Sequence, residues 1–358
     1  MSTIILTGGG SAGHCTPHLA ILPYLKKYFD KIYYIGSVNG IEKDIINKTD
    51  IPYFNITCAK LNRKFTLKNF LIPIRVIKGM REAGKIIDEL KPDVIFSKGG
   101  YVSVPTVIAA NKRKIPVISH ESDVTAGIAN KIIAKYSIKV LTTFPETAFD
   151  FKNGEYVGAP IRNLNTNKTK QEILTKYGFS GKKPVLLVMG GSLGAVAINN
   201  AVYDAINELT DKFDVLHICG KGNVNKRINK DGYYQTEFID SVEDAYKITD
   251  VCVSRAGSNA VFELLSIKKP CVFIPLPKGA SRGDQILNAE YFKKKGLCIL
   301  LEQEKLSAKS LILSVNHAYN SRKTLEKNFE HFPINDSSEK IALILKNATK
   351  EQSVRRRL

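Results

Sequence analysis

The chain has 358 residues, of which 44% are hydrophobic, so it is long enough for two domains that each bury a core. Lysine and arginine outnumber aspartate and glutamate by 53 to 34, and the net charge of +19 indicates an acidic partner such as nucleic acid, anionic lipid or a phosphorylated substrate. No apolar run approaches the roughly 18–20 residues of a membrane-spanning helix, so contact with a membrane would be peripheral.

The first predicted strand is the apolar run Ile4–Leu6, and because the chain opens on it directly we expect no signal peptide. A glycine loop, Thr7–His14, follows this strand, and a helix with Pro17 in its first turn comes next. Glycines between a strand and a helix present backbone N–H groups to a phosphate or another polar ligand. His14 adds a titratable group at the mouth of this loop.

The same loop matches the Gly-x-Gly-x-x-Gly pattern of dinucleotide-binding folds through Gly8, Gly10 and Gly13, a weak signal by itself. Such folds carry an acid at the end of the second strand, which we predict at 32–36. Residues 37–40 are Ser-Val-Asn-Gly, and Glu42 comes late. The pattern therefore disfavours a dehydrogenase.

The stretch 61–81 interleaves apolar side chains with lysines and arginines. One interpretation is a loop followed by an amphipathic core helix with a solvated basic face. The other is a membrane patch, in which apolar side chains enter the interface and basic ones meet anionic headgroups. The residues that we assign to such a patch are Phe70, Leu71, Ile74 and Arg75.

A strand at 93–96 leads into a further glycine turn, and a strand at 116–119 delivers His120-Glu121-Ser122-Asp123 to its carboxyl end, where α/β sheets place ligands. An alternative is that Asp123 caps a helix and His120 packs below it. Regular structure then breaks at 158–162. We place the linker between two domains in the polar run that follows.

The second half repeats the alternation, with strands expected at 184–189, 214–219, 236–239, 250–254 and 271–275. Another glycine loop, Gly190–Gly194, follows the first of these strands, and two such loops about 180 residues apart suggest two similar domains facing one cleft. A helix starting near Ser258 places Glu263 within two turns, where its carboxylate can accept two hydrogen bonds from a ribose diol. Glu263 could instead be an acid that complements the helix dipole.

Taken in order, eight motifs resemble the MurG family of UDP-N-acetylglucosamine transferases, which act in bacterial peptidoglycan synthesis. The resemblance covers nearly the whole chain, and its specificity comes from the order and spacing of all eight. The motifs are Gly-Gly-Gly-Ser-Ala-Gly-His at 8–14, Gly-Gly-Tyr-Val-Ser-x-Pro at 99–105, His-Glu-Ser-Asp at 120–123, Gly-x-Pro-x-Arg at 158–162, Gly-Gly-Ser-x-Gly-Ala at 190–195, Glu-Phe-Ile-Asp at 237–240, Arg-Ala-Gly-x-x-x-x-x-Glu at 255–263 and Asp-Gln-x-x-Asn-Ala at 284–289.

This resemblance implies an α/β chain with two Rossmann-like domains facing a cleft, the GT-B architecture. Residues 1–162 would form the acceptor-side, membrane-associated domain, with a final helix at about 336–350 packing back on it, and 163–335 would bind UDP-GlcNAc. The implied reaction moves GlcNAc from UDP-GlcNAc to the C4 hydroxyl of lipid I, with inversion and without a metal or cofactor. The implied location is the cytoplasmic face of the cell membrane, on anionic lipids, with no nucleic acid as partner.

The resemblance also implies roles for single residues. His14 would be the general base, with Glu121 as the second choice, although His14 could also cap a helix or face a phosphate without proton transfer. Ser11 replaces the usual threonine of the loop and keeps its hydroxyl, whereas Asp123 stands where some members have a donor-contacting asparagine. The implied UDP-GlcNAc contacts are Ser11, Ala12, Gly13, Asp123, Arg162, Ser192, Ile239, Ser258, Asn259, Ala260, Val261, Phe262, Glu263 and Gln285.

Two other classes stay open at this point. The nearer one is another GT-B enzyme, either a glycolipid glycosyltransferase or a UDP-GlcNAc 2-epimerase. The more distant one is a basic nucleic-acid binder without enzymatic activity, which the net charge allows. That second class leaves three glycine turns at strand ends unexplained.

Overall fold

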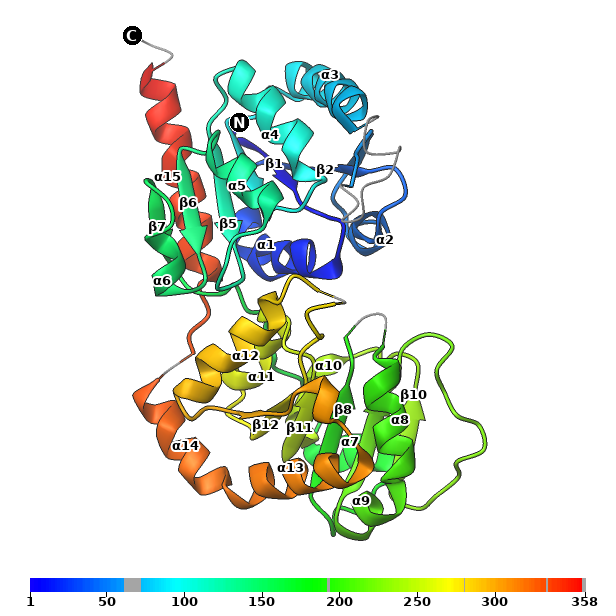
Figure 1. The fold of residues 1–358 in the computed structure, drawn as a ribbon. Coiled ribbons are helices and arrows are strands. Elements are labelled where there is room, and N and C mark those ends of the chain that lie inside the picture. Colours follow the sequence, from blue (N-terminus) through cyan, green and yellow to red (C-terminus); the bar gives the residue numbers. More distant parts are fainter. Residues whose placement is uncertain (61–71, 192–193, 280, 333, 356–358) are drawn as a thin grey trace. The chain divides into compact units, whose positions relative to one another are not determined.

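The computed structural model describes residues 1–60, 72–191, 194–279, 281–332 and 334–355 (Figure 1). The chain divides into two compact units. Unit 1 comprises Met1–Arg162 and Asp336–Leu358, and unit 2 comprises Asn163–Asn335. Each unit has its own parallel sheet and its own hydrophobic core.

The described part of unit 1 contains one sheet of seven strands, β1 (Thr3–Thr7), β2 (Lys31–Ser37), β3 (Tyr53–Ile56), β4 (Val94–Ser97), β5 (Val117–Glu121), β6 (Lys139–Thr142) and β7 (Gly154–Tyr156). Every neighbouring pair is parallel, and the spatial order is β3-β2-β1-β4-β5-β6-β7. The strand order therefore reverses between β1 and β4. In open α/β sheets, ligands bind outside the carboxyl ends of the strands at such a reversal.

Helices cover both faces of this sheet, as a buried parallel sheet requires. Ile4 and Leu6 of β1 face one core, which they share with Ile21, while Ile5 faces the opposite core with Ile87. The helical elements of the unit are η1 (Ala12–His14), α1 (Thr16–Tyr28), α2 (Ile41–Ile46), α3 (Ile72–Leu90), α4 (Ser103–Lys112), α5 (Ile128–Ala134), α6 (Pro145–Ala148) and α15 (Ser338–Arg355).

The helix α15 comes from the far end of the sequence and packs against α1 (Figure 1). Its residues Ile341, Ala342 and Leu345 have no exposed surface and belong to the same core as Leu25 and Phe29. The last helix of the chain therefore completes the first domain.

In the described part of unit 2, six parallel strands form a second sheet, in the order β10-β9-β8-β11-β12-β13, which reverses between β8 and β11. The strands are β8 (Val185–Met189), β9 (Asp214–Ile218), β10 (Tyr233–Thr236), β11 (Val251–Ser254), β12 (Cys271–Phe273) and β13 (Ile299–Leu300). The helical elements are α7 (Lys170–Lys176), α8 (Val196–Asp204), α9 (Ile206–Lys212), α10 (Val242–Ile248), α11 (Ser258–Ser266), α12 (Asp284–Lys294), η3 (Gln303–Lys305), α13 (Ala308–Asn320) and α14 (Arg322–His331).

Both units thus have the strand order of a Rossmann-like domain, and the predicted fold class is confirmed. One predicted strand is wrong in position. We expected it at 236–239, whereas β10 ends at Thr236, which pairs with Ile218 at the end of β9. An edge strand extends only as far as its single neighbour, and Phe238 beyond it is 55% exposed. Its apolar character indicated a strand where the chain forms a loop.

Candidate active site

Two glycine loops of unit 1 lie at the reversal of the strand order and contact each other. Gly8–Gly13 follows β1, and Lys98–Tyr101 follows β4. The backbone N–H of Gly9 donates to the carbonyl oxygen of Gly99, with 3.4 Å between the two atoms. Gly100 has a φ of +80°, and a Cβ atom there would lie 2.2 Å from the carbonyl oxygen of Gly9, so only glycine fits. The two loops therefore pack directly against each other at the carboxyl edge of the sheet.

His14 ends the short helix η1 and is partly buried beside these loops. Its Nδ1 lies 3.0 Å from the carbonyl oxygen of Lys98. Since a carbonyl oxygen only accepts, Nδ1 carries a proton, and in the neutral tautomer with this proton the lone pair is on Nε2. The bond fixes the orientation and the tautomer that a general base acting through Nε2 requires.

Glu121, the second candidate base, ends β5 and is 1% exposed. Its Oε1 accepts hydrogen bonds from the backbone N–H groups of Ser122 (2.8 Å) and Asp123 (3.0 Å), and its Oε2 accepts one from Nδ2 of Asn130 (2.7 Å). Asn130 in turn accepts one from the N–H of Gly100 at 3.1 Å. This carboxylate ties the end of β5 to the second glycine loop, so the geometry favours His14 as the base.

Glu42 is a buried acid that the sequence analysis set aside as too late in the chain. Its carboxylate accepts hydrogen bonds from the N–H of Ser37 at the end of β2 (3.1 Å) and from the N–H of Gly10 in the first loop (3.2 Å). A Cβ atom on Gly9 would lie 2.5 Å from the carboxyl carbon of Glu42. Glu42 therefore links the first glycine loop to the end of β2 through hydrogen bonds.

In unit 2, the glycine loop that starts at Gly190 follows β8 at the second reversal point. Gly194 has a φ of +75°, and a Cβ atom there would lie 2.1 Å from the carbonyl oxygen of Cys219, so the loop packs closely on the end of β9. Ser192, which we expected to contact the diphosphate, lies outside the described residues.

The predicted nucleoside segment forms the start of α11, directly after β11. The helix begins at Ser258, shortly after the end of β11, and β11 borders the reversal of the strand order. First-turn N–H groups of a helix in such a position can bind an anionic ligand. Val261 and Phe262 are 0% and 7% exposed, which places their side chains in the core. Asn259 and Ala260 are partly exposed. Ser258 is only 5% exposed as well, so the accessible side chains of this segment belong to Asn259, Ala260 and Glu263.

Glu263, the expected ribose ligand, is partly buried on α11. Its Oε2 accepts a hydrogen bond from the hydroxyl of Tyr246, with 3.3 Å between the oxygens, and Tyr246 is 2% exposed. On α12, Oε1 of Gln285 accepts a hydrogen bond from the N–H of Leu276 at 3.0 Å. This bond fixes the orientation of the amide, so that the N–H groups on Nε2 can donate a hydrogen bond to a sugar hydroxyl.

The other predicted contacts are distributed over both units. Ser11 and Gly13 are exposed, and Ala12 between them is partly buried, all immediately before His14. The remaining three are partly buried: Asp123 follows β5, Arg162 is the last residue before unit 2, and Ile239 lies in the loop after β10.

Of the predicted membrane patch, Phe70 and Leu71 lie outside the described residues. Ile74 is 64% exposed at the start of α3, Arg75 beside it is also exposed, and Ile77 one turn later is 49% exposed. The opposite side of α3 is buried in unit 1. Within the described residues, no helix is at once long enough and apolar enough to cross a bilayer.

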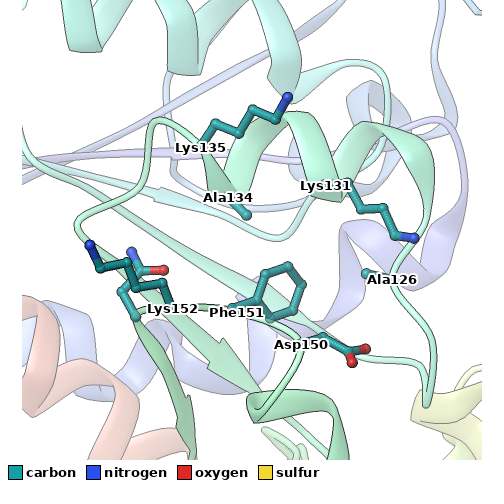
Figure 2. A pocket seen from close by; sticks show the side chains of 8 residues that line it. Ala126, Lys131, Ala134, Lys135, Asp150, Phe151 and Lys152 are labelled. Carbon is teal, nitrogen blue, oxygen red and sulfur yellow. The ribbon is translucent and has the colours of Figure 1, made fainter.

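A surface hollow of about 510 Å³ lies elsewhere on unit 1, between α5 and the segment that leads into β7 (Figure 2). The side chains of Lys131, Lys135 and Lys152 surround its apolar floor at Phe151. None of the predicted site residues lines this hollow.

Comparison with known proteins decides the family. Residues 4–142 match the glycosyltransferase family 28 N-terminal domain, and residues 185–345 match the glycosyltransferase family 28 C-terminal domain. The chain belongs to glycosyltransferase family 28. The resemblance that the eight motifs carry is thereby confirmed.

Relatives in family 28 match over almost their whole length. The UDP-N-acetylglucosamine--N-acetylmuramyl-(pentapeptide) pyrophosphoryl-undecaprenol N-acetylglucosamine transferase of Clostridium botulinum (strain 657 / Type Ba4) is 46% identical, over 98% of this chain and 100% of that protein. The transferase of the same name numbered 3 in Bacillus thuringiensis (strain Al Hakam) is 50% identical, over 90% of this chain and 94% of its own.

Solved structures show the same fold. The crystal structure of Acinetobacter baumannii MurG superimposes with a TM-score of 0.75 at 21% identity, covering 97% of this chain and 100% of that one. A glycotransferase of kitacinnamycin superimposes with a TM-score of 0.73 at 14% identity, covering 97% and 98% of the two chains. The shared two-domain fold is thus retained where little sequence identity remains.

Lys98 and Tyr246 are two of the residues of this family 28 chain that the sequence analysis did not single out. Lys98 is fully buried at the end of β4, and Tyr246 lies beneath Glu263. Tyr246 gave no signal, since a tyrosine in an amphipathic helix is ordinary. Lys98 did give one, because it is a charged residue between a buried strand and two glycines at an edge where ligands bind.

Proposed function

We propose that this chain is an N-acetylglucosaminyltransferase. It would transfer GlcNAc from UDP-GlcNAc to the C4 hydroxyl of the muramoyl-pentapeptide sugar on undecaprenyl diphosphate, converting lipid I to lipid II. The observation that carries the proposal is the full-length match to the Clostridium botulinum transferase, whose name states both the donor and the acceptor. The orientation of His14 supports it, because an inverting transfer needs a base for the acceptor hydroxyl.

The reaction that we propose is a single displacement. The acceptor hydroxyl attacks the anomeric carbon of GlcNAc while Nε2 of His14 takes its proton, and the bond from that carbon to the diphosphate oxygen of UDP breaks. The carbonyl oxygen of Lys98 keeps the proton on Nδ1 of His14, so that Nε2 receives the transferred one. Negative charge grows on the departing diphosphate, and backbone N–H groups of glycine loops stabilise such charge.

On the donor side, we propose that Glu263 accepts hydrogen bonds from the two ribose hydroxyls while Tyr246 holds its other oxygen. Gln285 would donate from Nε2 to a GlcNAc hydroxyl, because Leu276 occupies its carbonyl oxygen. The resemblance assigns Ser192 and Arg162 to the diphosphate and the backbone of Ile239 to the uracil.

The acceptor carries a polyprenyl chain and so stays in the bilayer. We propose that the chain reaches it as a peripheral protein on the cytoplasmic face of the membrane, through the exposed start of α3. Ile74 and Ile77 are available to enter the interface there, and Arg75 to meet anionic headgroups.

The experiment that tests this function is a UDP-release assay with purified protein, UDP-GlcNAc and different acceptors. We expect release that requires a muramoyl sugar on a lipid diphosphate, together with a disaccharide product. Release with a different glycolipid would identify another glycosyltransferase. Release without acceptor, or epimerised sugar, would identify an epimerase, and absence of release with all substrates would contradict the proposal.

A further inference from the structure

Lys98 places its amino group in the interior of unit 1. Its side chain has no exposed surface, although a charged group is costly to remove from water. Nζ lies 2.6 Å from Nδ1 of His120 and 2.7 Å from Oγ of Ser122. His120 lies near the end of the neighbouring strand β5, and Ser122 follows that strand directly. The lysine side chain therefore joins the carboxyl ends of β4 and β5.

The hydrogen bonds of His120 show which of its ring nitrogens donates and which accepts. Nε2 of His120 lies 3.1 Å from the carbonyl oxygen of Gly158, so Nε2 carries the proton and donates. Nδ1 then holds the lone pair and accepts a hydrogen bond from Nζ of Lys98. Burial, and the positive charge of Lys98, hold the pKa of His120 well below its usual range, which keeps the ring neutral.

Gly158 opens the segment that leads out of unit 1. It has a φ of +98°, a conformation that favours glycine. A few residues later, the N–H of Ile161 donates to Oδ1 of Asp336 at 2.8 Å, and the N–H of Ser337 donates to the carbonyl oxygen of Ala159 at 3.1 Å. The two stretches that pass between the units are thus bonded to each other, and His120 holds the first of them.

The backbone of Lys98 serves the other side of the site. Its carbonyl oxygen accepts the Nδ1 proton of His14, and its own N–H donates to the carbonyl oxygen of Thr7 at 2.9 Å. A displacement of Lys98 would therefore move the acceptor atom that orients His14. Lys98 therefore contacts the proposed base through its backbone, and through its side chain it contacts His120, which in turn donates to Gly158.

We propose that Lys98 is a positioning residue for the transfer reaction. Its buried amino group, held by His120 and Ser122, fixes the end of β4 so that the carbonyl oxygen of Lys98 keeps His14 in the reactive orientation. Through His120, the same amino group fixes Gly158. This inference rests on the proposed function, and it adds a residue to which neither the motifs nor the relatives' names assign a role.

The first test substitutes Lys98→Met, which keeps the length of the side chain and removes its N–H donors. Lys112→Met, at an exposed position on α4, is the matched control. We expect kcat with the lipid acceptor to fall on the order of 10–100-fold, because small displacements of a reacting group are costly. KM for UDP-GlcNAc should stay within about twofold, since the proposed nucleoside contacts lie in unit 2. Lys98→Gln, which keeps a donor for His120, should recover part of kcat.

Two further readouts separate positioning from a loss of packing. In ¹⁵N NMR spectra of the imidazoles, Nδ1 of His120 should lose its hydrogen-bonded shift in Lys98→Met while Nε2 stays protonated. The second readout is the pH dependence of unfolding. Burial lowers the pKa of Lys98 to about 7, against the opposing effect of Glu121 and Asp123, while His14, His18 and His120 also surround it. The unfolded state then binds the extra proton between about pH 7 and 10, so stability should rise with pH there, and less so in Lys98→Met.

The outcomes are distinct. Wild-type kcat in folded Lys98→Met, or an unchanged His120 spectrum, would overturn the inference while the proposed function stood. A wild-type protein without acceptor-dependent UDP release would remove the proposed function itself. If Lys98→Met does not fold, Ser122→Ala replaces it, since it removes one acceptor of the ammonium and keeps the lysine. We then expect kcat to fall several-fold at constant KM for UDP-GlcNAc, and an unchanged kcat would overturn the inference.

Discussion

The tautomer of His14 depends on a backbone carbonyl, whereas general-base histidines in many hydrolases are held by a carboxylate. A carbonyl orients the ring without adding a full negative charge beside it. The carboxylate of Glu121, the other candidate for the base, accepts hydrogen bonds from three N–H groups of the protein. The hydrogen bonds of the two candidates therefore differ, and we propose that His14 is the base while Glu121 holds the end of β5.

Substitution of His14 tests this separation. His14→Ala should lower kcat by roughly 10²–10⁴-fold, since proton transfer to the base is lost, while KM for UDP-GlcNAc changes little. Steady-state kinetics with the lipid acceptor measure both, and His317→Ala on the exposed side of α13 serves as control. Near-normal turnover in His14→Gln would exclude His14 as the base.

Glu121→Gln is expected to act differently. Loss of the charge weakens the bonds to Ser122, Asp123 and Asn130, so the unfolding free energy should fall along with kcat.

A second residue-scale prediction concerns the donor. Glu263→Ala should raise KM for UDP-GlcNAc by roughly 10–100-fold, because hydrogen bonds to a charged acceptor contribute about 1.5–3 kcal/mol. Tyr246→Phe should raise it less, since the carboxylate keeps its charge and loses only the bond that fixes one oxygen. Glu326→Ala, at an exposed position on α14, is the control. Unchanged donor affinity in Glu263→Ala would remove this residue from the ribose.

At the scale of elements, α3 carries two exposed isoleucines near its start, Ile74 and Ile77, through which we propose that it contacts the membrane. Ile74→Ser with Ile77→Ser should weaken binding to vesicles that contain anionic lipid, and wild-type binding should decline as salt rises, because each basic residue contributes on the order of 1 kcal/mol that ions screen. Vesicle cosedimentation measures this, with UDP binding as the control for folding.

Leu313→Ser is the matched substitution on an exposed apolar position of α13 in unit 2. If the α3 variant sediments with vesicles as well as the parent, α3 is an ordinary solvated surface and the membrane contact lies elsewhere, for instance at the arginines 355–357.

The sequence predicted the strands that are recognisable as apolar runs ending at a turn. The strand before Gly8 and the strand before His120 are buried on both faces, so their apolar runs are continuous and easy to recognise. Short edge strands such as β7 and β13 were missed, because two or three residues carry no period. The shift of β10 has the same origin, since its length depends on β9 rather than on its own residues.

The site was predictable to the extent that its residues follow strands directly. The partners that fix those residues come from distant parts of the chain: Lys98 for His14, Asn130 for Glu121 and Tyr246 for Glu263. Such pairings are properties of the folded sheet order. A local sequence motif therefore cannot predict these pairs of residues.

At the scale of the whole molecule, α15 links the two ends of the chain in one core. Leu345→Ala should lower the unfolding free energy of unit 1 by about 2–5 kcal/mol, because it leaves a cavity at a position with no exposed surface. Leu343→Ala, two residues away and 47% exposed, should change it by less than about 0.5 kcal/mol. Urea unfolding followed by hydrogen exchange in each unit measures the difference, and equal effects of the two substitutions would show that α15 is not docked.

The position of α15 also sets the order in which the protein is finished on the ribosome. Unit 2, Asn163–Asn335, is synthesised completely before the helix that closes unit 1 emerges. At about 5–20 residues per second, the nascent first domain waits roughly 10–35 s with the surface around Leu25 and Phe29 uncovered. The domain that is translated first is therefore the last for which all of its residues are available.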